Sequence, residues 1–244
     1  MFLKNSERLA IVDFDSTKIT YNKMINNVKY FSRSIYKDIK EDNFVLIIAE
    51  NRIEWIYSLF AIWDRLSVPI AIDALSSKEE IEYFLNDTKP CAVIVTNQTK
   101  NTVKETINNC NFEVSIYNVD DVIISDYEDD KELRHPQGDD TAVMIYTSGT
   151  TGNPKGIMLT YNNIIGEIEA IKSFNITFDD EQVIAILPFH HILPLMTTCL
   201  YIFYHVNQYS IVLVPKLTSQ EILKRFKENN VTLMAVVPRV YKMF

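Results

Sequence analysis

The stretch AVMIYTSGTTGNPKGIMLT, residues Ala142–Thr160, decides how this chain folds. Its first six residues, AVMIYT, are almost continuously apolar, which is typical of a strand buried on both faces of a sheet. Its last four residues, IMLT, are typical of another short strand. The intervening SGTTGNPKG therefore predicts a loop that joins two strands at the edge of a sheet.

Glycine is concentrated in this loop. The chain has only five glycines, and three of them are Gly149, Gly152 and Gly156. Glycine permits positive φ angles and lets the backbone approach a ligand closely, and successive amide N–H groups in such a turn form a concave anion site. The segment also carries hydroxyl groups and one ammonium group, on Thr147, Ser148, Thr150, Thr151 and Lys155.

Together these donors predict a site for phosphate or pyrophosphate, and Asn153-Pro154 would set the bend of the loop. A tight polar hairpin turn is the alternative, but such a turn needs one or two glycines and no array of hydroxyls. The loop differs from the GxxxxGK[ST] phosphate loop, which would need a glycine where Pro154 stands. It also differs from the dinucleotide fingerprint, because no helix opens at the glycines.

Apolar runs and amphipathic stretches alternate along the rest of the chain. The runs that predict further strands are FVLIIA from Phe44, VPIAI from Val68, CAVIVT from Cys91, VIAIL from Val183, SIVLVP from Ser210 and VTLMAVV from Val231. The stretches that predict helices are 24–35, 52–66, 77–88, 161–174 and 219–230. This alternation predicts an α/β fold with mainly parallel sheets flanked by helices.

Length, composition and net charge limit the kinds of function that we expect. The chain has 244 residues, 47% of them hydrophobic, which is enough to bury a sizeable core. Its formal net charge of −8 argues against nucleic-acid binding, which needs a basic stripe, but leaves room for a local nucleotide site. Cys91, Cys110 and Cys199 lack the spacing of a zinc site or a disulfide framework, so we expect a reducing, cytoplasmic location. The first residues contain no apolar run long enough for a signal peptide.

Three other stretches give expectations of their own. Residues 182–215 contain no Asp, Glu, Lys or Arg, and their most apolar part, 192–206, is shorter than the roughly 20 residues of a membrane-spanning helix. We expect a buried helix there, with peripheral contact to a membrane surface as the alternative.

The charge-rich residues 120–132 predict a solvated surface loop. The last residues, VVPRVYKMF, predict a strand and the first turn of a helix, and we expect the chain to be the front part of a longer protein.

Several motifs carry a resemblance to a known family. YTSGTTGNPKG (Tyr146–Gly156), followed by IMLTYNNI, resembles the signature of the AMP-forming adenylating enzymes, which include acyl-CoA synthetases, nonribosomal adenylation domains and beetle luciferase. LPFHHILPLMTT (Leu187–Thr198) is similar to the family's aromatic and histidine motif at the acyl pocket, and VTLMAVVPRVY is similar to the strand after it. KITYNKMINNVKYF and LFAIWDRLSVPIAID resemble the family's early helices, so the resemblance covers essentially the whole chain.

The resemblance implies roles for particular residues. The loop would cradle the β- and γ-phosphates of ATP, and the residues implied in nucleotide binding are Thr147, Ser148, Gly149, Thr150, Thr151, Gly152 and Lys155. Thr147 would also help to hold Mg²⁺, and Lys155 would offset charge on the departing pyrophosphate. His191 would lie near the α-phosphate and the acyl entrance. Without the resemblance, a histidine pair flanked by apolar residues is more typical of a structural role.

The resemblance also implies the reaction. Family members join a carboxylate to AMP and pass the acyl group to a thiol, often that of coenzyme A. The absence of acidic residues from 182–215 disfavours a free amino acid, so we expect a fatty or aryl acid, most similar to the substrates of fatty-acid–CoA ligases. The alternatives are a carrier-protein thiol as acceptor, a luciferase-like oxidative second step, and a nucleotide-binding or scaffolding module that has lost catalysis. No obligate protein partner is evident from the sequence.

The resemblance finally implies a domain organisation of two stacked α/β subdomains. Residues 42–178 would form the first subdomain, with the phosphate loop, and residues 1–41 with 179–244 would begin the second. The family's Thr-Glu motif, its ribose-binding acid and its C-terminal lid with a catalytic lysine would lie beyond Phe244. We therefore expect these 244 residues alone to be inactive.

Overall fold

The computed structural model describes residues 2–147, 154–174, 180–204 and 209–241. They fall into two compact units. The larger-sheet unit comprises residues 26–50 and 54–164, and the smaller-sheet unit comprises the described residues of 1–25, 51–53 and 165–244. The subdomain boundaries expected from the sequence, 42–178 and 1–41 with 179–244, stay a prediction.

The larger-sheet unit is built on a six-stranded sheet with the strand order β6-β5-β3-β4-β7-β8. Its strands are β3 (Phe44–Ile48), β4 (Val68–Ile72), β5 (Ala92–Val95), β6 (Ser115–Asn118), β7 (Thr141–Thr147) and β8 (Lys155–Thr160). β8 pairs antiparallel with β7 at one edge, and the other strands run parallel. The central strands are apolar at nearly every position because both faces of a parallel sheet are covered.

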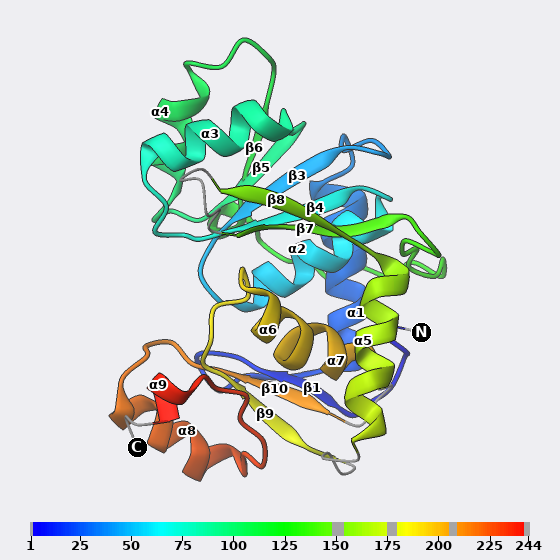
Figure 1. Ribbon diagram of the computed structural model, residues 1–244. Helices are drawn as coiled ribbons and strands as arrows, with labels where there is room; N and C mark the ends of the chain where they lie inside the picture. Colours follow the sequence, from blue (N-terminus) through cyan, green and yellow to red (C-terminus); the bar gives the residue numbers. More distant parts are fainter. Residues whose placement is uncertain (1, 148–153, 175–179, 205–208, 242–244) are drawn as a thin grey trace. The chain divides into compact units, whose positions relative to one another are not determined.

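Helices cover both faces of this sheet (Figure 1). The helices are α2 (Ile53–Asp64), α3 (Lys78–Thr88) and α4 (Lys100–Ile107), and a short 3₁₀ helix, η2 (Val119–Asp121), follows β6. α3 and α4 lie on one face, where Phe84 and Val103 join a buried cluster with the strand residues Leu46 and Val93. α2 lies on the opposite face (Figure 1).

The charge-rich segment 120–132 begins with the last two residues of η2 and is irregular from residue 122 on, as expected of a loop, but it is anchored rather than only solvated. Arg33 forms ion pairs with Asp129 at 2.5 Å and with Asp64 at 3.3 Å. The ammonium group of Lys29 donates a hydrogen bond to the carbonyl oxygen of Asp129. These two basic residues come from α1 (Tyr21–Tyr30) and from the π-helical turn η1 (Phe31–Ile35) that continues it.

The smaller-sheet unit holds a four-stranded sheet with the order β2-β1-β10-β9. Its strands are β1 (Leu9–Val12), β2 (Lys18–Thr20), β9 (Gln182–Ala185) and β10 (Ser210–Leu213). β1, β10 and β9 are parallel, and β2 is antiparallel to β1. The remaining helical segments are α5 (Tyr161–Ser173), α6 (Ile192–Pro194), the π-helical η3 (Leu195–Leu200), α7 (Tyr201–Tyr204), α8 (Ser219–Asn229) and α9 (Pro238–Tyr241).

The buried helix expected within 192–206 is confirmed for its described part. α6, η3 and α7 follow one another without a break over 192–204. Leu195, Cys199 and Phe203 are fully buried, and burial raises the pKa of the Cys199 thiol. In the described parts of the chain, no helix combines the length and the apolar character that crossing a membrane would require.

The strand predicted from Val231 is wrong. Residues 231–237 contribute a single parallel bridge, between Leu233 and Val183 of β9. Their apolar side chains serve packing instead, since Val231, Met234 and Val236 pack against a buried cluster that contains Ile222. The first turn of a helix expected at the end of the chain is confirmed by α9.

A buried arginine fixes one end of the smaller sheet. Arg225 of α8 is 2% exposed, and its guanidinium donates hydrogen bonds to the carbonyl oxygens of Asp13, at 3.0 Å, and of Phe14. It also pairs with Glu221 one turn earlier on α8, at 3.2 Å. The turn between β1 and β2 is therefore held by a side chain more than two hundred residues away, at sequence separations of 212 and 211.

The predicted α/β class, with two mainly parallel sheets flanked by helices, is confirmed.

Candidate functional site

The β7–β8 hairpin brings two of the predicted site residues together. Its register pairs Tyr146 with Gly156 and, as the last pair, Thr147 with Lys155. Thr147 ends β7, so it lies at the carboxyl edge of the parallel strands. In open α/β sheets, ligands bind outside the carboxyl ends of the strands. The antiparallel return of β8 places Lys155 at this same edge.

Both side chains are available to a ligand. Thr147 and Lys155 are exposed, and neither side chain has a hydrogen-bond or ion-pair partner among the described residues. A hydroxyl donor beside an ammonium group is a donor set that suits a phosphate oxygen. The pair could therefore bind an anion at the end of the hairpin.

Gly156 has a packing role in this hairpin. A Cβ atom at this position would lie 1.9 Å from the Cε of Met144 and 3.5 Å from the Cε1 of Tyr146. Met144 is 7% exposed and belongs to the buried cluster under α3 and α4, so a side chain at 156 would force Met144 to turn away. Glycine therefore lets the Met144 and Tyr146 side chains pack over β8.

The other predicted loop residues, Ser148, Gly149, Thr150, Thr151 and Gly152, lie outside the described residues. Their predicted contacts with phosphate stay predictions. The two ends of the loop, at Thr147 and at Pro154, are described. The structure therefore describes the two strand ends that the loop connects, the end of β7 and the start of β8.

His191 belongs to the smaller-sheet unit. It follows the carboxyl end of β9 and stands just before α6, where its carbonyl oxygen accepts the backbone N–H of Leu195 at 3.1 Å. Its ring is exposed and lies 4.2 Å from the ring of His190, between centroids, at an angle of 56°. His191 therefore has the exposure that contact with a substrate needs.

Sequence reasoning missed a residue that holds the histidine motif in place. The Nδ2 of Asn51 donates to the carbonyl oxygen of Leu187 at 2.8 Å, and its Oδ1 accepts the backbone N–H of Phe189 at 2.8 Å. One amide side chain thus satisfies two backbone groups on either side of Pro188. No local pattern around Asn51 predicts this contact, because its partners come from a distant part of the chain.

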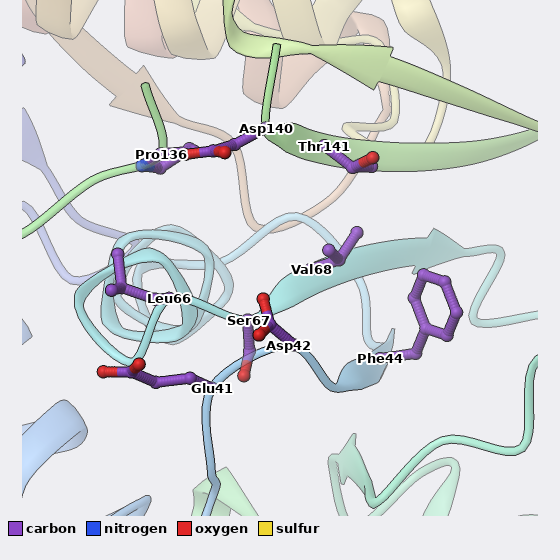
Figure 2. A pocket seen from close by; sticks show the side chains of 9 residues that line it. All are labelled: Glu41, Asp42, Phe44, Leu66, Ser67, Val68, Pro136, Asp140 and Thr141. Carbon is purple, nitrogen blue, oxygen red and sulfur yellow. The ribbon is translucent and has the colours of Figure 1, made fainter. Parts of the chain in front are cut away.

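A pocket of about 410 Å³ lies at the opposite, amino edge of the larger sheet (Figure 2). Phe44, Val68 and Thr141, which line it, begin β3, β4 and β7. The other lining residues are Glu41, Asp42, Leu66, Ser67, Pro136 and Asp140. The carboxylates among them would repel a triphosphate, so this pocket does not suit the predicted nucleotide.

The described parts of the chain contain no group of three or more His, Cys, Asp or Glu side chains that could hold a metal ion. The Mg²⁺ role predicted for Thr147 would therefore rest on one hydroxyl together with the oxygen atoms of a bound nucleotide, an arrangement that Mg²⁺ commonly adopts.

Comparison with protein families gives a match over nearly the whole chain. The model described as AMP-binding enzyme matches residues 3–244.

Curated proteins similar to the chain are varied. The chain is 26% identical over 247 residues to the hybrid PKS-NRPS synthetase traA of Penicillium crustosum, covering 99% of this chain and 6% of that protein. It is 24% identical over 234 residues to 2-succinylbenzoate–CoA ligase of Bacillus velezensis, covering 95% and 46%. It is 24% identical over 223 residues to a long-chain-fatty-acid–[acyl-carrier-protein] ligase of Arabidopsis thaliana, covering 77% and 31%. The chain thus spans less than half the length of each of these relatives.

Solved structures share the fold. ATP-bound MatB from Rhodopseudomonas palustris superposes with a TM-score of 0.83 at 21% identity, covering 98% of this chain and 48% of that one. O-succinylbenzoate CoA synthetase (MenE) from Bacillus subtilis, in complex with its acyl-adenylate intermediate, gives a TM-score of 0.82 at 20% identity, covering 97% and 60%.

Proposed function

Because the chain belongs to the AMP-binding enzyme family, we propose that it is part of an ATP-dependent ligase that adenylates a carboxylic acid. In this reaction an oxygen of the carboxylate attacks the α-phosphorus of ATP, and the bond to pyrophosphate breaks. The acyl group then passes from AMP to a thiol, for which we propose coenzyme A. The observation that carries the proposal is the exposed pair Thr147 and Lys155 at the carboxyl edge of the larger sheet.

The chemistry explains why such a pair is useful. A carboxylic acid with a pKa of about 4–5 is already ionised at neutral pH, so the first step needs no general base. The obstacle is that one anion must approach another, and catalysis has to come from positioning and charge neutralisation. The ammonium group of Lys155 would offset charge on the leaving pyrophosphate, and the hydroxyl of Thr147 would donate to a phosphate oxygen. Mg²⁺ bound with the nucleotide would neutralise further charge, with Thr147 as a protein ligand.

We propose a fatty acid as the carboxylate. Residues 182–215 carry no acidic side chain that could pair with the ammonium group of an amino acid. The segment 192–204 next to His191 is apolar and largely buried, which suits an acyl chain better than a charged substrate. His191 would lie at the acyl entrance. An aryl acid is the alternative carboxylate, and a cytoplasmic location is part of the same proposal.

Two other candidates have support of their own. A carrier-protein thiol is an alternative acceptor, because one relative is named as a ligase of long-chain fatty acids to acyl-carrier protein. Activation of an amino acid is the alternative substrate class, because another relative is named as a PKS-NRPS synthetase.

The test is ATP–pyrophosphate exchange by the intact protein with MgATP and separate sets of fatty acids, aryl acids and amino acids. We expect exchange that depends on a fatty acid, followed by acyl transfer when coenzyme A is added. Transfer to a carrier protein alone would correct the acceptor, and exchange with amino acids alone would correct the substrate. If none of the carboxylates supports exchange, the chain is a nucleotide-binding module rather than part of a ligase.

A further inference from the structure

One face of helix α3 contacts β7 and the residue directly before β8, next to the pair Thr147 and Lys155. We propose that Tyr83 and Asp87 of α3 are positioning residues that set the spacing of this pair for the phosphates of ATP. The proposal rests on the function proposed above. It concerns two residues that themselves would not touch the substrate.

The first contact holds β7. The phenol of Tyr146 donates a hydrogen bond to the Oδ2 of Asp87 at 2.6 Å. This length is typical of a bond from a hydroxyl group to a carboxyl oxygen. Burial and the bond to Asp87 both raise the pKa of the Tyr146 phenol, so it stays protonated and donating. Tyr146 directly precedes Thr147, and its contact with α3 therefore limits how far the end of β7 can move.

The second contact holds the start of β8. The phenol of Tyr83 donates to the carbonyl oxygen of Pro154 at 2.9 Å. That oxygen belongs to the peptide unit that also contains the backbone nitrogen of Lys155, and a peptide unit is planar and stiff. The hydrogen bond therefore orients the backbone from which the Lys155 side chain leaves.

Aromatic packing joins the two contacts. The ring of Tyr146 lies 4.3 Å from the ring of Phe84 and 6.3 Å from the ring of Tyr83, between centroids. Tyr83 and Asp87 are four residues apart on α3, so they project from the same face of the helix. The end of β7 and the residue that precedes β8 are thus each held by one polar contact with the same helix.

α3 is well suited to act as that surface. Its first turn is closed by a capping box in which Ser77 accepts from the backbone of Glu80 and the Glu80 side chain accepts from the backbone of Ser77. Its last turn ends at Lys89 in the left-handed conformation, with the Lys89 N–H bonded to Leu85. Ile81, Phe84 and Leu85 are buried against the sheet. A helix capped at both ends and buried along one side moves little relative to its sheet.

The experiment compares the affinity of the intact protein for MgATP with its affinity for AMP, by equilibrium binding. AMP lacks the β- and γ-phosphates, so loss of spacing between Thr147 and Lys155 should weaken MgATP and spare AMP. The variants are Tyr83→Phe, Asp87→Ala and Tyr146→Phe, each of which removes one hydrogen-bonding group of the contact with α3. Asp87→Asn keeps an oxygen that can accept from Tyr146 and serves as the conservative rescue.

A matched control removes a similar bond elsewhere in the same unit. The phenol of Tyr30 donates to the carbonyl oxygen of Ile123 at 3.1 Å, so Tyr30→Phe deletes a tyrosine–carbonyl bond far from α3 in sequence. We expect Tyr83→Phe, Asp87→Ala and Tyr146→Phe each to weaken MgATP about fivefold, the effect of losing one hydrogen bond of ordinary strength. Affinity for AMP should change by less than about twofold, and Asp87→Asn and Tyr30→Phe should bind MgATP about as well as the wild type.

A double variant separates the contact from its neighbours. Asp87→Ala combined with Tyr146→Phe should weaken MgATP no more than either change alone, because both remove the same bond. If MgATP affinity is unchanged, or if MgATP and AMP weaken equally, the inference is overturned while the proposed function stands. If the wild type binds MgATP but supports no pyrophosphate exchange, the proposed function fails and the positioning role is still decided by the variants. A wild type that binds no MgATP overturns both.

Discussion

The side chain of Asn51 accepts the backbone N–H of Phe189 across 138 residues of sequence, at 2.8 Å. The same side chain donates to the carbonyl oxygen of Leu187 at 2.8 Å. The segment that leads from β9 to His191 is thus fixed by one amide group from another part of the chain. An aspartate at this position could accept from Phe189 but would set a carboxylate against the oxygen of Leu187.

Replacing Asn51 should therefore be costly in stability. In Asn51→Ala, the two backbone groups lose their partner, and we expect the free energy of unfolding to fall by about 1–3 kcal/mol. Denaturant titration of the intact protein measures this change. Asn86→Ala is the control, because Asn86 is exposed and, among the residues that the structure describes, bonds only within its own helix, and it should change stability by less than about 0.5 kcal/mol. Equal effects of the two substitutions would contradict the role given to Asn51.

Lys155 should matter for the chemical step rather than for folding. Its side chain is exposed at the start of β8, so Lys155→Gln should leave thermal stability unchanged. Pyrophosphate exchange should slow by about 10²–10³-fold, the usual effect of removing one donor that stabilises developing charge. Lys172→Gln, which removes a partly exposed lysine of α5 paired with Glu169 at 3.0 Å, should leave the rate unchanged. A Lys155→Gln rate within about twofold of the wild type would rule out its role at the phosphates.

Arg225 should be among the residues on which the smaller sheet depends most. Its replacement by methionine leaves the carbonyl oxygens of Asp13 and Phe14 without these donors, and Glu221 without its pair. We expect Arg225→Met to lower the free energy of unfolding by about 3 kcal/mol. The control is Arg8→Met, which breaks the exposed ion pair with Asp180 at 2.8 Å and should cost less than about 1 kcal/mol. Thermal unfolding of the two variants side by side would show whether the difference exists.

The Asp129 anchor predicts a pH dependence. The backbone N–H of Lys131, which the Asp129 carboxylate accepts, and the guanidinium of Arg33 lower the pKa of Asp129 to about 2. An unfolded chain has an aspartate pKa of about 3.9, so the folded state binds this proton more weakly. The contribution of Asp129 to stability is therefore complete above about pH 4 and is lost as the pH falls toward 2. Asp129→Asn should flatten the pH dependence of stability in this window.

The control for that experiment is Asp130→Asn, a substitution at the exposed neighbouring position. It should leave the slope between pH 4 and pH 2 as steep as in the wild type, whereas Asp129→Asn should not. Urea titrations at closely spaced pH values measure both slopes. If Asp129→Asn kept the full slope, the anchor of the segment 120–132 would lie elsewhere.

Much of the fold could be predicted because the central strands are apolar almost throughout. FVLIIA, for example, is apolar at every position, which is typical of a strand in a sheet covered on both faces, and its first five residues form β3. The strand predicted at 231–237 is wrong because these apolar residues have no aligned partner strand in the part of the chain that the structure describes. Those residues are as apolar as a strand, but their side chains fill a cluster around Ile222 while a single backbone bridge forms at Leu233. Apolar content predicts burial, and it predicts a strand only where a partner strand is aligned.

Weakly apolar elements escaped prediction for a related reason. α4, KNTVKETI, buries mainly Val103 and also Thr106, whose hydroxyl bonds to the carbonyl oxygen of Thr102 at 2.8 Å. A polar residue that is satisfied by its own helix leaves no mark in a pattern of apolar residues.

The candidate site likewise contains residues that the sequence predicted and residues that it did not. Thr147 and Lys155 were predicted because glycines and hydroxyls gather around them, and their roles stay predictions. Tyr83, Asp87 and Asn51 could not be found from the sequence. Their partners lie 71, 59 and 138 residues away, and no local spacing encodes those contacts.

The antiparallel return of β8 also bears on how the protein folds. Pairing Thr147 with Lys155 closes a short stretch of chain, whereas pairing β7 with β4 joins Met144 to Ile70. The entropy lost on closing a loop grows with its length, and hairpins form within about 1–10 μs while long-range parallel pairing is slow. The hairpin can therefore form early, before α3 has packed against it.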